Sequence, residues 1–219
     1  MTPAIPTQSM AANYRQAATA DPRAAVMTTG EHELLCEHDF RHLHETFPSE
    51  LLVLGNRDEH AGSDKTYTVH ARTLHDRGSW QVDPANLPAA WTRLVAELVT
   101  GDYQSTLLAA LGIEPGRVRR VELRLAEYRV GGWMSRHTDR PDKVYSHLIY
   151  FCPGWRPDWR GDLTFYADEH THVALTSLLP GAGISVAFAR TDSSWHEVMP
   201  VAGHAEQTRR TLLLHGYVA

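Results

Sequence analysis

The sequence predicts a mainly β fold with flanking helices, because short extended runs fill its C-terminal half and helical periodicity marks its middle. Seven apolar runs follow Gly116, separated by Gly, Pro, Asp or Trp: VELRLAEYRV, VYSHLIYF, DLTFYAD, HVALTSLL, GISVAFA, HEVMPVAG and TRRTLLLHGYV. Consecutive short strands of this kind are typical of a sandwich or a barrel. No repeat period relates the runs, which argues against a solenoid.

The residues before Gly116 supply the expected helices. The segment 31–54 has apolar residues near helical spacing, and its last part, 51–54, is an apolar run that could begin a strand. The segment 65–72, KTYTVHAR, alternates as a strand does. The segment 87–111 predicts a pair of amphipathic helices interrupted near Gly101, and we expect these helices to buttress a sheet.

The length and composition indicate one folded domain. With 219 residues, of which 42% are hydrophobic, the chain is long enough to bury one substantial core. Residues 1–30 are rich in Ala, Thr and Pro without clear periodicity, so we expect a flexible N-terminal arm there. The single domain is then expected over 31–219, with the strands that carry the chemistry from about 117 to 219.

Charge and cysteine content narrow the function classes. A net charge of -5 provides no general attraction to nucleic acid or to an anionic membrane. Cys36 and Cys152 form no disulfide framework, so a reducing, cytoplasmic location is expected. We found neither a secretory pattern nor eighteen consecutive apolar residues, and expect neither export nor membrane insertion. The oligomeric state is left open.

His137 and Asp139 form a candidate metal site. They follow a Gly131–Gly132 turn, and their i,i+2 spacing on extended backbone points both side chains to the same side. His196 opens a later predicted strand and completes a set of two histidines and one carboxylate. Such a set leaves three coordination positions of an iron ion open for oxidant chemistry. A second His-x-acid pair, at His204, lies in a polar connection and is expected to be solvated.

Arg209 and Thr211 form a candidate anion site on the last predicted strand. They lie two residues apart, so they share a face with Leu213 and His215. A buried arginine there would need an anion, and a guanidinium binds a carboxylate through two parallel hydrogen bonds. With a third hydrogen bond from Thr211, the pair suits the far end of a dicarboxylic cosubstrate. The adjacent Arg210 is an alternative anchor.

Together these motifs resemble the iron(II)- and 2-oxoglutarate-dependent oxygenases, particularly the prolyl-hydroxylase-like branch with its double-stranded β-helix, or jelly-roll, core. The resemblance covers roughly 121–218, and Asp162 departs from it, standing where the family has a second Gly. The elements come in the family's order: EYRVGGWMSRHTD, LIYFCPGW, RGDLTFY, WHEVMPV and RRTLLLHGY. The resemblance implies that iron is bound by His137, Asp139 and His196, and 2-oxoglutarate by Arg209 with help from Thr211, Tyr150 and Tyr128.

The resemblance also implies a reaction. A small molecule such as an amino acid or secondary metabolite would be hydroxylated, desaturated or cyclised, with dioxygen consumed and succinate and CO2 released. Related halogenases have Gly or Ala in place of the carboxylate, so Asp139 argues against chlorination. Nucleic-acid demethylases typically carry a second arginine where this chain has His215, so DNA or RNA is not the expected substrate. The candidate substrate-binding residues, which suit an anionic or amino-acid-like ligand, are Arg124, Arg129, Trp133, Arg140, Trp155 and Trp195.

Two other interpretations stay open. A cupin-like metal enzyme that does not use 2-oxoglutarate would explain His170 and His172, which stand at strand spacing. No acidic residue follows them at that family's usual distance. A non-enzymatic jelly-roll binding module would make the histidines and Asp139 structural. The pair His38 and His42 lacks a third ligand at a recognisable spacing and is set aside.

Overall fold

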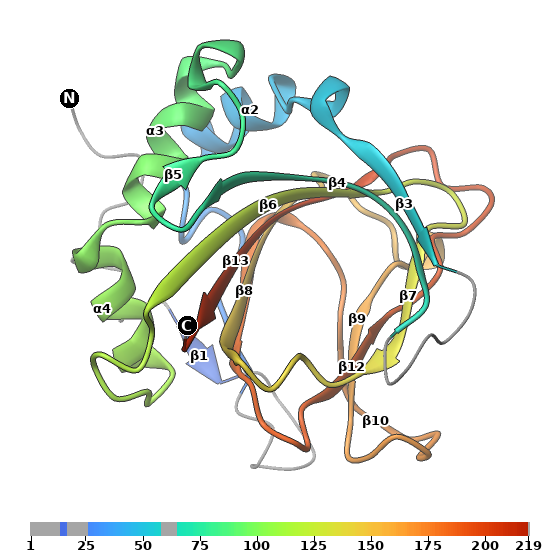
Figure 1. Ribbon diagram of the computed structural model, residues 1–219. Helices are drawn as coiled ribbons and strands as arrows, with labels where there is room; N and C mark the ends of the chain where they lie inside the picture. The colour runs from blue at the N-terminus through green and yellow to red at the C-terminus, as the bar shows by residue number, and fades with distance from the viewer. Residues whose placement is uncertain (1–13, 17–25, 58–64, 219) are drawn as a thin grey trace.

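The computed structural model describes residues 14–16, 26–57 and 65–218. In this part of the chain, one curled antiparallel sheet is flanked by three α-helices, as Figure 1 shows. The helices are α2 (Glu37–Glu45), α3 (Ala89–Leu98) and α4 (Gly101–Ala110), with 3-10 turns η1 (Ser49–Leu51), η2 (Pro84–Asn86) and η3 (Pro157–Trp159). The strands are β1 (Arg15–Gln16), β2 (Val26–Thr28), β3 (Val53–Arg57), β4 (Tyr67–Asp76), β5 (Ser79–Trp80), β6 (Arg120–Tyr128), β7 (Trp133–His137), β8 (Lys143–Phe151), β9 (Leu163–Tyr166), β10 (Ala174–Leu178), β11 (Ala182–Ala189), β12 (Trp195–Val198) and β13 (Arg209–Tyr217).

The sheet curls into two facing walls. Its order is β1-β2-β11-β8-β13-β6-β4-β7-β12-β9-β10, and β3 and β5 also pair with β4. One wall holds β11, β8, β13 and β6, and the other holds β7, β12, β9 and β10 (Figure 1). Strand β4 joins the walls, because Tyr67 and Thr68 pair with β7 while the segment 70–75 pairs with β6. This architecture confirms the predicted mainly β, jelly-roll fold.

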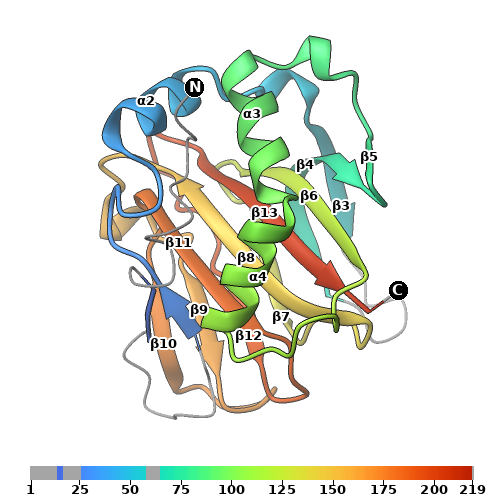
Figure 2. The ribbon, with the colours of Figure 1, turned by 90° about the vertical axis from the view of Figure 1, so that its left-hand side faces the viewer.

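Strand alternation divides the apolar side chains between two cores. Successive residues of a strand point to opposite faces of the sheet. Leu123 and Leu125 of β6 belong to the core that the helices cover, where Trp91 and Leu94 of α3 are fully buried. Figure 2 shows α2, α3 and α4 across this outer face. The opposite faces of the strands line the space between the walls. A second apolar cluster lies there and includes Ala126, Tyr128, Leu148, Leu163 and Phe188.

The predicted elements agree with this fold, with informative differences. Each of the seven predicted strands is present, as β6 and β8 to β13. The predicted helix pair is α3 and α4, and Thr100 separates them because its hydroxyl accepts a hydrogen bond from the backbone N–H of Tyr103 and caps α4. Of the helix predicted over 31–54, only α2 forms. Pro48 follows it, and a proline cannot continue an α-helix because it lacks the backbone N–H. Strand β7 was not predicted separately, since its sequence WMSRH has no apolar alternation.

The predicted N-terminal arm lies largely outside the described residues. Its described parts are strands of the sheet: β1 pairs with β2, and β2 pairs with β11. Tyr14 is buried, and its hydroxyl lies 2.8 Å from Nε2 of His147 on β8. These parts are therefore tied to the domain rather than free. No α-helix in the described ranges is long and apolar enough to cross a membrane.

Candidate metal centre and cosubstrate pocket

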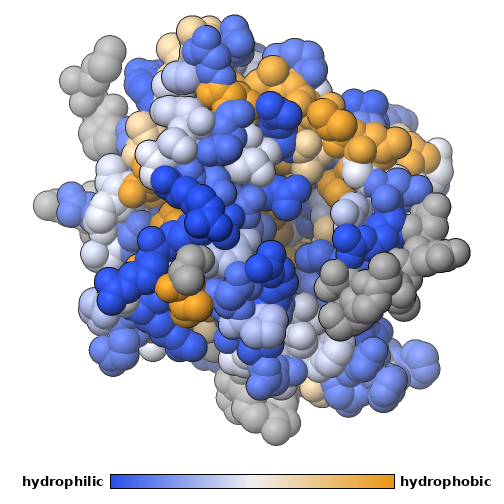
Figure 3. Space-filling model, in the orientation of Figure 1, coloured by the Kyte–Doolittle hydropathy of each residue, from blue (hydrophilic) through white to orange (hydrophobic). Residues whose placement is uncertain are grey.

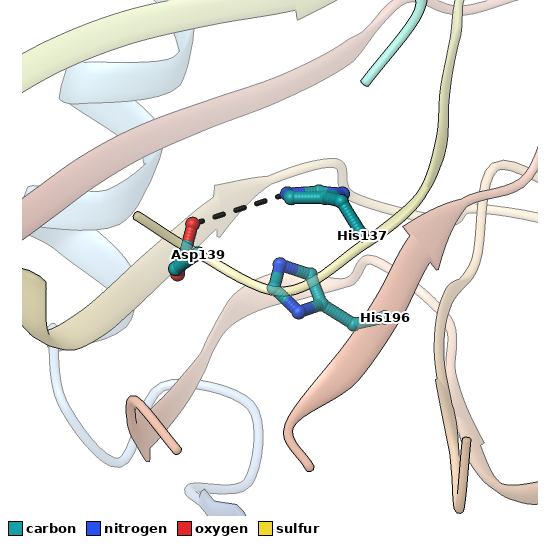
Figure 4. Close-up of side chains that lie close together, drawn as sticks. All are labelled: His137, Asp139 and His196. Atoms are coloured by element: carbon teal, nitrogen blue, oxygen red, sulfur yellow. Dashed lines mark ion pairs between the residues drawn. The ribbon is translucent and has the colours of Figure 1, made fainter. Parts of the chain in front are cut away.

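The predicted metal ligands lie together because β7 and β12 are neighbours. His196 of β12 is the register partner of His137 at the end of β7, and Asp139 lies two residues beyond that end. The possible ligand atoms of the three residues all lie within 4.8 Å of one another, and all three side chains are buried. Figure 4 shows them converging, with 3.9 Å between Nε2 of His137 and Oδ1 of Asp139.

Both imidazoles are held with Nε2 unprotonated. Nδ1 of His137 lies 2.8 Å from the carbonyl oxygen of Ser135, and Nδ1 of His196 lies 2.9 Å from that of Ser194. A carbonyl only accepts, so each Nδ1 carries the proton and each Nε2 keeps its lone pair. Burial lowers the pKa of His196, and burial with the charge of Lys65 lowers that of His137 well below its usual range. The rings are therefore neutral, as metal ligands must be.

Asp139 is held as an oriented, ionised carboxylate. Lys143 donates to Oδ1 at 2.8 Å, and the Ser146 hydroxyl donates to Oδ2 at 2.7 Å. Burial alone would raise the pKa of Asp139, but the positive charges of Lys143 and Lys65 outweigh it and hold that pKa well below its usual range. Sequence reasoning missed Lys143 and Ser146, although both lie on the strand that follows Asp139.

These residues fit an iron(II) ion. Two imidazole nitrogens and one carboxylate on one side of an ion are the donor set of non-haem iron(II) oxygenases. The Lys65 ammonium lies 3.1 Å from Nε2 of His137, so the lone pair points to a position that favours a cation. Within the described ranges, no other cluster of three or more His, Cys, Asp or Glu is placed to hold a metal. His38 and His42 are exposed on α2, and His204 lies 3.4 Å from Asp158 instead.

Arg209 is a buried cation between the walls. Only 1% of it is exposed, and it packs against the rings of Tyr128 and Tyr150 at 4.8 and 4.9 Å from their centroids. Its guanidinium donates to the Gly161 carbonyl at 2.7 Å, to the Thr211 hydroxyl at 3.2 Å and to the Tyr150 hydroxyl at 3.2 Å. No carboxylate of the described residues lies within the 4.0 Å that defines an ion pair with it. A buried charge without a counter-charge is costly, so this pocket suits an anion.

Gly161 is a further residue of this pocket that sequence reasoning did not single out. Its φ of +75° lies in the left-handed region that favours glycine, and a Cβ there would lie 3.3 Å from Cδ of Arg209. The glycine thus lets its own carbonyl approach the guanidinium. The only signal for it was the resemblance of RGDLTFY to the family's glycine-rich hairpin.

Residues 123–215 match the family model of the 2OG-Fe(II) oxygenase superfamily. The predicted resemblance to that superfamily is thereby confirmed over this segment. The matched segment runs from β6 to β13 and includes the triad and Arg209. The match confirms the expected class of enzyme and the cofactors iron(II), 2-oxoglutarate and dioxygen.

Solved structures share the fold of the oxygenase at low sequence identity. A Pseudomonas putida prolyl-4-hydroxylase has a TM-score of 0.63 at 18% identity, covering 90% of this chain and 94% of its own. A Trichoplax adhaerens prolyl hydroxylase, in complex with a hypoxia inducible factor oxygen degradation domain peptide fragment, has a TM-score of 0.64 at 16% identity. The match covers 88% of this chain and 83% of the hydroxylase. A Burkholderia pseudomallei oxidoreductase of the 2OG-Fe(II) oxygenase family has a TM-score of 0.63 at 14% identity, and the match covers 98% of this chain and 92% of the oxidoreductase. No curated protein sequence matches the chain.

A cavity of about 630 Å³ opens between the walls of the oxygenase and reaches the triad. Of the four predicted cosubstrate-binding residues only Tyr128 lines it, and of the six predicted substrate-binding residues Arg124 and Arg140 do. The other four do not line it: Arg129 lies 3.5 Å from Glu127, the Trp155 indole donates to the Arg160 carbonyl, and Trp133 and Trp195 are half-buried on β7 and β12. The lining also includes Glu122, His215 and Tyr217, none of which was a predicted site residue.

Proposed function

We propose that this oxygenase hydroxylates a small molecule bound in its cavity and couples that reaction to the oxidative decarboxylation of 2-oxoglutarate. The observation that carries the proposal is the arrangement of two built sites on the inner faces of one curled sheet. One is a neutral two-histidine, one-carboxylate donor set, and the other is the buried Arg209 without a carboxylate partner. A dicarboxylic cosubstrate could chelate an ion held by the donor set with one end and pair its other carboxylate with Arg209.

In the proposed complex, His137, Asp139 and His196 hold iron(II), which supplies the one-electron chemistry needed to activate dioxygen. Arg209 binds the distal carboxylate of 2-oxoglutarate, because its donors already lie in one plane beside Thr211 and Tyr150. The hydroxyls of Thr211 and Tyr150 rotate to donate to the same carboxylate. The ring of Tyr128 packs over the guanidinium and keeps water from it.

Asp139 also bears on the type of reaction. Its carboxylate is buried, ionised and held by two hydrogen-bond donors, so it is available as the third protein ligand. A carboxylate in that position leaves no site for chloride, which supports hydroxylation, or desaturation or cyclisation, over chlorination.

The cavity supports a small substrate. Its volume, about 630 Å³, falls within the range of sites that bind small molecules. We further propose a cytoplasmic location, which is supported by the free state of both cysteines, Cys36 and Cys152.

A residue within a peptide is the second candidate substrate. Val53 and Leu54 on β3 line the cavity, yet they are 61% and 54% exposed, and Figure 3 shows hydrophobic surface in the upper right, where β3 lies in Figure 1. An exposed apolar edge beside a cavity is suited to an extended chain. The similarity to a prolyl hydroxylase with a bound peptide is consistent with this candidate.

The proposed function is tested by following 2-oxoglutarate turnover in the iron-loaded enzyme. We expect succinate formation that consumes dioxygen, is stimulated by a member of a library of amino acids and metabolites, and yields a product heavier by one oxygen atom. Succinate formation without iron(II), or none in the presence of any compound or prolyl peptide, would contradict the proposal.

A further inference from the structure

Glu122 and Arg124 place opposite charges side by side on the cavity wall. They lie two residues apart on β6, so they share the inner face of that strand with Ala126 and Tyr128, and both line the cavity. The strand register links Glu122 to the metal site. Glu122 is opposite His215 on β13, His215 is opposite Ser146 on β8, and the Ser146 hydroxyl donates to Asp139. Two strand spacings, about 10 Å, therefore separate Glu122 from the strand position that supports the metal ligand.

The Arg124 guanidinium has no hydrogen-bond acceptor among the described residues. Its Nε is buried without a hydrogen-bond partner, and its ion pair with Oε1 of Glu122 is long, at 3.9 Å. The side chain is 40% exposed, so its other donors reach the cavity. An arginine in this state presents donors in the planar arrangement that matches a carboxylate.

Two other arginines that line the cavity have their donors engaged by an aspartate. Arg120 donates to both carboxylate oxygens of Asp76, at 2.6 and 2.9 Å. Arg140 donates to both oxygens of Asp142, at 3.0 and 2.7 Å. Arg124, which makes no hydrogen bond to a described residue, is placed to donate to a carboxylate from outside the protein.

Glu122 is an ionised carboxylate with acceptor capacity to spare. It accepts from the Tyr217 hydroxyl at 2.8 Å and, weakly, from the Thr73 hydroxyl at 3.3 Å. Two carboxylate oxygens offer about four lone-pair sites, so acceptor positions remain. If the ligand whose carboxylate binds Arg124 also carries a cationic group, that group could donate to the remaining acceptor positions of Glu122.

We propose that Arg124 and Glu122 bind the α-carboxylate and the α-ammonium group of a free amino acid, whose side chain extends toward the metal centre. Adjacent opposite charges on the wall match the adjacent opposite charges of a zwitterion. A purely anionic substrate would be repelled by Glu122, and a residue inside a peptide carries neither charge. The proposal deepens the proposed function, on which it rests, by naming the substrate class.

The test measures binding without turnover, in the protein loaded with Mn(II) and 2-oxoglutarate. Calorimetric titration of each of the common free amino acids is expected to find at least one that binds, while its N-acetyl amide does not. Arg124→Met and Glu122→Gln should each weaken its binding about 10- to 100-fold. The matched control Arg119→Met, at an exposed position just before β6, should leave that affinity unchanged.

The affinity for 2-oxoglutarate separates this inference from the proposed function. We expect both variants to bind 2-oxoglutarate as the wild type does, which also shows that they are folded. If the wild type binds 2-oxoglutarate but no amino acid, the zwitterion site is refuted and the oxygenase assignment stands. Equal binding of the free and blocked forms, or unchanged affinity in Arg124→Met, would also refute the site. If 2-oxoglutarate itself does not bind, both proposals fall.

Discussion

Arg209 and Arg210 are neighbours in sequence but project to opposite faces of β13. Arg209 is enclosed between the walls beside Tyr150. Arg210 instead donates from Nε to Oε1 of Glu127 at 3.1 Å and packs over the Phe47 ring on the helix-covered side. Alternation along the strand thus separates a guanidinium that lacks a carboxylate partner from one that has a partner within the protein.

This difference gives a matched pair of variants. Arg209→Met should weaken 2-oxoglutarate binding about 100-fold, because charge-assisted hydrogen bonds to the carboxylate are lost. Arg210→Met should leave 2-oxoglutarate affinity within about twofold and instead lower the free energy of unfolding, since the buried Glu127 loses its shorter arginine contact and keeps only the 3.5 Å contact with Arg129. Calorimetry in the presence of Mn(II) measures both affinities. The opposite pattern would assign the anchor to Arg210.

The sequence could predict the triad and the anchor because both depend on strand periodicity. An i,i+2 spacing places His137 and Asp139 on one side, and the same rule places Arg209 and Thr211 on one face. His196 needed more, since its position beside His137 depends on which strands pair. The family's order of motifs supplied that information.

The supporting residues could not be predicted in this way. Lys143 and Ser146 contact Asp139 through the fold of the turn between β7 and β8, and Gly161 reaches Arg209 across the sheet. Nothing in local periodicity distinguishes such residues from ordinary polar ones. Trp133 and Trp155 illustrate the converse, because aromatic residues beside a motif need not line its cavity.

The contact between Lys143 and Asp139 couples metal binding to stability. Asp139→Ala should abolish iron(II) binding and also lower the free energy of unfolding by about 3–5 kcal/mol, because a buried ammonium loses its carboxylate. The double variant Asp139→Ala, Lys143→Met should regain most of that stability without regaining iron. Urea unfolding in the presence of chelator and equilibrium iron binding provide the two readouts. Iron binding by either variant would contradict the assigned ligand.

Gly161 is expected to control cosubstrate affinity through backbone geometry. In Gly161→Ala, the new Cβ would meet Arg209 Cδ at 3.3 Å on a residue with a φ of +75°, so the carbonyl that orients the guanidinium must shift. We expect 2-oxoglutarate to bind about tenfold more weakly, with Mn(II) affinity unchanged. The control is Gly203→Ala, where a Cβ meets nothing within 4 Å. Equal effects in the two variants would rule out this role.

His147 should make stability depend on pH. It is fully buried between the hydroxyls of Tyr14 and Tyr103, and burial lowers its pKa from 6.5 to about 3. Between these two values the unfolded chain binds a proton that the native ring does not, so the free energy of unfolding falls as the pH falls, by up to about 1.4 kcal/mol per unit. In His147→Gln that contribution should vanish. Urea unfolding at about pH 7 and about pH 5 measures it, and equal pH dependence in both proteins would contradict a neutral buried imidazole.

The central claim is that His137, Asp139 and His196 hold iron(II) within reach of a 2-oxoglutarate anchored by Arg209. Anaerobic titration of iron(II) into the protein with 2-oxoglutarate tests it most directly, because chelation of the keto acid to the ion produces a weak visible charge-transfer band and needs no substrate. We expect the band in the wild type, its loss in His196→Ala, and a higher 2-oxoglutarate requirement in Arg209→Met. No band in the wild type, or an unchanged band in His196→Ala, would contradict the account.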